Sequence, residues 1–204
     1  LFYDTGYLAW KSYLVNITLT FGFIDTNASM VPGGWSIGNE LVYYLITPIL
    51  ISIFLIDKKY GILVSIISFL MGIVYTQLML DGNRNIEVQN SLYISPINNL
   101  FFYVAGLYIY FNANFINKSV LLNFVFLFIL FIVFMAIPAD GNQIKILTNY
   151  NRFYFSITSI LIVLLIYRFG ELNLPFILES VFDFFGKISY GVYLLHPLSR
   201  IFVE

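Results

Sequence analysis

The chain is dominated by apolar runs long enough to cross a lipid bilayer. Phe, Tyr, Leu and Ile fill stretches of about 18 to 20 residues, the helical length needed to cross about 30 Å of hydrocarbon. Of the 204 residues, 60% are hydrophobic, 20% aromatic and only 10% charged, whereas about a quarter of a soluble domain is charged. The sequence therefore predicts an all-α integral membrane protein.

Seven runs are candidate membrane-spanning helices, and the segments between them are rich in Asn, Asp, Gly and Pro. No long linker or repeat separates them, so we expect one membrane-embedded domain over residues 1–204, folded as a polytopic helical bundle. Because residue 1 is not Met and the chain stops soon after His196–Pro197, we expect this domain to be incomplete at both ends. The predicted spans are 7–24, 36–56, 60–80, 96–112, 119–138, 153–169 and 184–203.

The basic residues suggest which side of the membrane each loop faces. If the spans alternate, one side carries Lys11, Lys58, Lys59, Lys118, Arg168 and Lys187, and the other carries Arg84, Lys145, Arg152 and Arg200. The side richer in Lys and Arg is usually cytoplasmic. We therefore expect the segment 26–35 and the loops 81–95 and 139–152 to face outward.

Composition also limits the ligands that this chain can recognise. The net charge is −1, so no basic surface indicates nucleic acid. With no Cys and one His, we expect no protein-built metal site and no bound cofactor. No feature indicates an oligomeric state.

A polar stripe runs along the predicted span 36–56. Six residues share one helical face at spacings of three and four: Ser36, Asn39, Glu40, Tyr43, Tyr44 and Thr47. An ionisable side chain inside a span costs about 2.5–3.5 kcal/mol, so we expect Glu40 to be protonated, paired or facing a water-filled cavity. The alternative is an interfacial Glu that reaches the headgroups or caps the helix near Ser36, with Trp35 as an interfacial anchor.

A second stripe lies on the last predicted span, where Ser189, Tyr193, His196 and Arg200 share one face. A neutral imidazole can donate and accept, which suits His196 for proton relay or substrate binding. The alternative is a buried His bonded to a neighbouring helix. Gly106, within the span 96–112, is expected to permit close helix packing.

These residues resemble a known family. The stretch GGWSIGNELVYYLITP is similar to the signature of the membrane-bound acyltransferase-3 family, with Gly33, Gly34, Trp35, Ser36, Glu40, Tyr44 and Pro48 in register and Tyr43 where Phe is usual. The stretch ISYGVYLLHP resembles the closing motif of the family through Ser189, Tyr190, Tyr193, Leu194 and His196, although Pro197 follows His directly. Members usually have ten spans, so this chain resembles the third to the ninth.

The resemblance implies transfer of an acyl group, usually acetyl, from acyl-CoA to a hydroxyl of a cell-surface or exported carbohydrate at the bacterial plasma membrane. The main catalytic His of the family lies in the first spans, outside this chain, so Glu40 and His196 are expected to have supporting roles. Glu40 would orient that His or hydrogen-bond the sugar. The expected substrate contacts are Trp35, Ser36, Tyr44, Ser189, Tyr190 and Tyr193.

Two other functions fit the residues alone. A membrane transporter or flippase of a glycan or a lipid-linked intermediate would also need intramembrane Glu and His, but it predicts an inverted repeat, which the sequence lacks. A structural or sensory membrane component would tolerate replacement of Glu40 and His196 with effects on stability alone.

Overall fold

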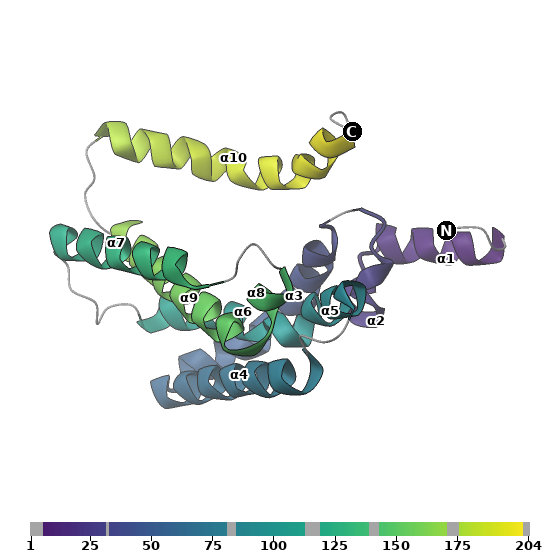
Figure 1. Cartoon of the computed structure of the whole chain (residues 1–204), viewed down its shortest axis with the longest axis horizontal. Coiled ribbons are helices and arrows are strands. Elements are labelled where there is room, and N and C mark those ends of the chain that lie inside the picture. The colour runs from purple at the N-terminus through teal and green to yellow at the C-terminus, as the bar shows by residue number, and fades with distance from the viewer. Residues whose placement is uncertain are drawn as a thin grey trace.

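The computed structural model describes residues 6–31, 33–80, 85–112, 119–138, 143–170 and 176–201, and every regular element in these ranges is a helix (Figure 1). The elements are α1 (Gly6–Ile17), α2 (Phe21–Ile24), the short 3₁₀ helix η1 (Thr26–Ala28), α3 (Trp35–Ile56), α4 (Lys58–Met79), α5 (Ile86–Tyr93), α6 (Pro96–Asn112), α7 (Val120–Ala136), α8 (Gln143–Leu147), α9 (Asn149–Gly170) and α10 (Phe176–Ile201).

Three of the described helices are long and apolar enough to cross a bilayer: α3, α4 and the segment Asn149–Arg168 of α9. The segments Glu87–Tyr93 and Pro96–Asn112, bent by 40° at a short break, qualify together as a fourth span. The apolar stretch Leu121–Ala136 in α7 is shorter. The all-helical membrane fold agrees with the sequence prediction, but seven spans are not confirmed.

The differences from the predicted spans have local causes. The predicted span 7–24 is divided into α1 and α2 by a turn, in which Leu19 has a φ of 57°. The last span was predicted to begin at residue 184, but α10 begins at Phe176 and carries Glu179, Asp183 and Lys187 on its first turns. A helix with this many charges lacks the uniform apolar surface of a membrane span.

Two segments predicted as loops contain helices. The loop 81–95 holds α5, and the loop 139–152 holds α8 and the first turn of α9. These short polar helices contact each other, and α5 also contacts α6. Their stability comes from such packing rather than from an apolar stripe of their own, which is the signal that sequence reasoning uses.

The helices after α2 pack with small residues at their contacts. α4 lies along α6, and α7 lies along α9. Gly61 of α4 faces the Phe54 ring of α3, and Gly72 of α4 faces the Phe101 ring of α6. Small residues let membrane helices approach closely. Gly106 does not serve this purpose, because a Cβ built there meets no atom within 4 Å; that prediction was wrong.

A close backbone approach joins α2 to α3. A Cβ on Gly22 would overlap the carbonyl group of Gly38, and a Cβ on Gly38 would overlap the Phe21 ring. Phe21 and both glycines are buried. This contact holds the segment before the Pro-Gly-Gly turn against the first turns of α3.

Gly38→Ala should therefore destabilise the protein, because the added methyl meets backbone and a buried ring that have no room to move. Overpacking of this kind costs about 1–3 kcal/mol. Thermal unfolding in detergent should show a lower midpoint for Gly38→Ala. The matched control is Gly106→Ala, which adds the same methyl to open space; an equal fall in both variants would contradict the packing argument.

Candidate functional site

The site is built around the first three turns of α3. Before the helix, Gly33 has a φ of 78°, in the left-handed region that side chains disfavour. The Ser36 hydroxyl donates to the Gly33 carbonyl at 2.9 Å. The glycine turn therefore sets where α3 begins and which side chains share its polar face.

The predicted polar stripe of α3 divides into two rows. The first row is Asn39, Tyr43 and Thr47, and it faces the break between α5 and α6. The Asn39 amide donates to the Ile94 carbonyl at 2.9 Å, and the Tyr43 hydroxyl donates to the Pro96 carbonyl at 2.8 Å. Thr47 shares a 2.5 Å hydrogen bond with the Tyr103 hydroxyl, and Tyr103 stacks on Tyr43 with ring centroids 4.9 Å apart. This row is structural.

The second row is Ser36, Glu40 and Tyr44, and it faces α10. The Ser36 hydroxyl is hydrogen-bonded to the Tyr193 hydroxyl. Tyr44 interacts with the Glu40 carboxylate and lies within electrostatic range of Tyr190. Tyr44 is 60% exposed, in contrast to 8% for Tyr43. The second row thus combines one carboxylate with several hydroxyls that remain accessible.

α10 reaches this row mainly through its tyrosines. It runs along one side of the molecule, apart from the other helices for much of its length (Figure 1), and its described side chains are exposed. The Tyr193 hydroxyl also lies 3.4 Å from the Gly33 carbonyl. Ser189 donates to the Gly186 carbonyl of its own helix at 2.8 Å. Ser189 and Tyr193 line one pocket of about 580 Å³, so they share a face as predicted.

The His196 prediction is only partly described. The backbone of His196 belongs to α10, but its side chain lies outside the described residues. Its place relative to Glu40 therefore stays a prediction.

A buried cation that sequence reasoning missed lies beside this site. Arg152 of α9 is 5% exposed, and its guanidinium donates to the Asn99 side chain at 3.3 Å. The guanidinium lies 4.7 Å from the Tyr93 ring centroid, within cation–π range. Tyr93 also meets Trp35 edge-on, with ring centroids 6.5 Å apart. Trp35 therefore contacts α5 through Tyr93, and its role as an interfacial anchor stays a prediction.

The region around the α5–α6 break holds several buried polar atoms without a partner in the described part of the chain: Asn39 Oδ1, Asn98 Oδ1, both amide atoms of Gln89, and Arg152 Nε. The Asn98 and Asn99 amides both donate to the Tyr93 carbonyl at 2.8 Å. The feature of the sequence that could have revealed this buried polar region is the run of polar residues at 85–99, which was predicted to form a loop and the start of a span. Burying a cation and amides in a membrane protein is costly, and residues of this kind often mark a functional site.

The two sequence motifs therefore meet, although 157 positions separate Ser36 from Tyr193. The sequence profile of a family described as an acyltransferase domain, acyltransferase 3, matches residues 2–203. The chain belongs to the acyltransferase-3 family. No curated protein and no solved structure matches the chain at a significant level.

In this family-3 acyltransferase, Ser36, Tyr44, Tyr190 and Tyr193 lie around one end of α3, together with Glu40. A carboxylate next to phenolic hydroxyls can accept a hydrogen bond from a substrate hydroxyl, and the phenols can donate to substrate oxygens. Among the described residues, no three His, Cys, Asp or Glu side chains are grouped to hold a metal ion.

The adjacent tyrosines 43 and 44 allow the two rows to be separated by experiment. Tyr43→Phe removes the hydrogen bond that joins α3 to the first turn of α6, so we expect a loss of stability of about 0.5–1.5 kcal/mol. Tyr44→Phe removes an exposed hydroxyl that interacts with the Glu40 carboxylate, so we expect little change in stability and reduced acyl transfer. Detergent unfolding curves and acyl-transfer assays on both variants provide the check. A stability loss in Tyr44→Phe, with none in Tyr43→Phe, would reverse the assignment.

Proposed function

We propose that this protein transfers an acetyl group from acetyl-CoA to a hydroxyl of a cell-surface or exported carbohydrate at the bacterial plasma membrane. Membership of the family supports acyl transfer to carbohydrate. The observation that carries the proposal is the meeting of the two motifs at Ser36 and Tyr193, which gathers accessible hydroxyls around Glu40. The acyl donor, the acetyl group and the cell-envelope acceptor are the proposed parts.

The reaction sets clear requirements for the site. The acceptor oxygen forms a bond to the thioester carbonyl carbon, the carbon–sulfur bond breaks, and the hydroxyl proton is transferred to the departing thiolate. A base must lie near the attacking oxygen, and donors must stabilise the charge that develops on the carbonyl oxygen. We assign Glu40 to orient the acceptor hydroxyl or the base that deprotonates it.

The tyrosines and Trp35 supply the binding surface in this proposal. Tyr44 and Tyr190 offer amphipathic rings with hydroxyl tips, which suit the mixed polar and apolar faces of a sugar. Ser36, Ser189 and Tyr193 add hydroxyls at the contact between α3 and α10. His196 has a supporting role in binding substrate or bracing α3.

The test uses the full-length reading frame, deleted and then restored as wild type or as Glu40→Gln. Glutamine keeps the size of the side chain but removes its charge. Mass spectra of the surface glycans should lose an acetyl-sized modification on deletion, regain it with wild type and lack it with Glu40→Gln, at equal protein levels by immunoblot.

A transporter or flippase would give a different pattern in the same experiment. The glycan would keep the same composition throughout but would fail to reach the cell surface when the gene is deleted. That outcome, or full acetylation with Glu40→Gln, would contradict the proposed role of the site.

A further inference from the structure

A second cavity lies beside the break between α5 and α6. We call it the outer pocket; it measures about 490 Å³. It is formed by α2, η1, the α5–α6 break and one residue each from α3 and α4. Its lining residues include Phe23, Asp25, Thr26, Asn27, Ser95 and Tyr75.

The polar groups of the outer pocket suit a sugar. Asp25 Oδ1 accepts from the Asn27 backbone and side chain, both at 2.9 Å, so the second carboxylate oxygen is left to accept from a ligand hydroxyl. The hydroxyls of Thr26 and Ser95 form no side-chain hydrogen bond within the described part of the chain. Phe23, 51% exposed, offers a ring on which a sugar face can pack. Among the lining residues that the structure describes there is no Lys or Arg, and Asp25 is the only charged one.

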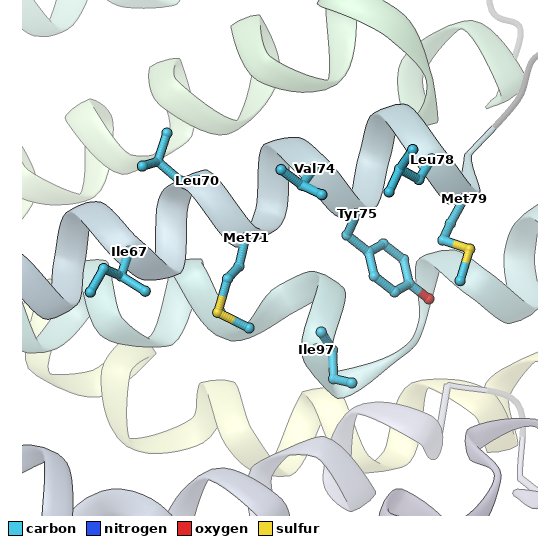
Figure 2. A pocket seen from close by; sticks show the side chains of 8 residues that line it. All are labelled: Ile67, Leu70, Met71, Val74, Tyr75, Leu78, Met79 and Ile97. Atoms are coloured by element: carbon cyan, nitrogen blue, oxygen red, sulfur yellow. The ribbon is translucent and has the colours of Figure 1, made fainter.

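The outer pocket adjoins an apolar groove along α4, which has a volume of about 490 Å³. Figure 2 shows the lining side chains of the groove along α4, with Ile97 contributed by α6. Tyr75 and Ile97 line both cavities. The Tyr75 hydroxyl donates to the Leu92 carbonyl at 3.1 Å, which holds the ring at the junction.

The length of the groove matches one leaflet of a bilayer. It runs from Ile67 to Met79, which is about 18 Å along a helix, and one half of the hydrocarbon core is about 15 Å thick. Its polar end is the end of α4 that lies next to α2, η1 and the start of α3.

We propose that the outer pocket and the groove together bind a neutral glycolipid, with the sugar in the outer pocket and an apolar chain in the groove. A phosphate in the pocket would face the Asp25 carboxylate, with no cation among the described lining residues to offset the repulsion, which disfavours anionic headgroups. Val42 of α3 also lines the pocket, on the side of the helix about 200° away from Glu40, and the Gly22–Gly38 contact fixes α2 to the same helix. The proposal concerns binding of the glycolipid and does not rest on the acyl transfer proposed above.

The experiment measures lipid binding by native mass spectrometry of the full-length protein released from detergent. The probes are monoglucosyl-diacylglycerol, phosphatidylglycerol with the same acyl chains, and methyl glucoside. We expect the glycolipid to be retained in preference to both others. Thr26→Val and Asp25→Asn should each weaken retention about fivefold, the effect of one lost hydrogen bond.

The groove is tested separately on α4. Leu78→Trp, at a residue that is 71% exposed, should fill the groove and lower glycolipid retention to a similar extent. Leu63→Trp makes the same change on an exposed part of α4 outside the groove and should leave retention unchanged.

Three results would overturn the proposal. Equal retention of phosphatidylglycerol would make the groove an ordinary lipid contact. Binding of methyl glucoside as tight as that of the glycolipid, together with no effect of Leu78→Trp, would indicate a soluble sugar. Full retention by the pocket variants would place the sugar elsewhere.

The binding assay is also run on Glu40→Gln, which should still retain the glycolipid because Glu40 is not among the lining residues. A failure of the acetylation experiment, with binding intact, would then reject the proposed function alone. Loss of binding specificity, with acetylation intact, would reject only this inference.

Discussion

Polar side chains on a membrane helix must find hydrogen-bond partners within the protein, and the arrangement of α3 depends on this constraint. Asn39 donates to the carbonyl of Ile94, which the end of α5 leaves without a helical partner, and Tyr43 donates to the carbonyl of Pro96 in the first turn of α6. The polar row thus satisfies a carbonyl at the break, and the break gives the polar side chains of α3 their acceptors. This pairing holds α3 at a fixed rotation, and its second row is thereby directed toward α10.

The two rows assign different tasks to neighbouring residues of one motif. The buried row keeps the helix in place, while the exposed row carries Glu40 and the hydroxyls that meet α10. Arg152 of α9 is linked to the same motif, because its guanidinium packs on the Tyr93 ring and Tyr93 in turn contacts Trp35. Much of the motif thus serves to position a few accessible groups, and substitutions in its two rows have separable consequences.

Sequence reasoning recovered the parts of this protein that have strong periodic signals. The span 36–56 agrees with α3 to one residue, and the loops 26–35, 81–95 and 139–152 do gather at one end of the bundle through Trp35, Tyr93 and Arg152. The helix α5 was missed because it is short and largely polar, and the contacts that hold it, including those around the buried Gln89, are tertiary contacts that no local pattern reveals. Arg152 was counted only as a topology signal, since its partners lie on other helices. The outer side of these loops stays a prediction.

The buried arginines of α9 also bear on how the protein is assembled. Arg152 and Arg168, near opposite ends of this span, are 5% and 3% exposed in the folded protein. Each would face lipid or headgroups if α9 entered the bilayer by itself, and charged residues weaken insertion. The Arg152 guanidinium contacts side chains on α5 and α6, and both of these helices precede α9 in the chain. The buried position of Arg152 is therefore available only once those earlier helices are in place, so the order of synthesis coincides with the order in which this side chain finds its partners.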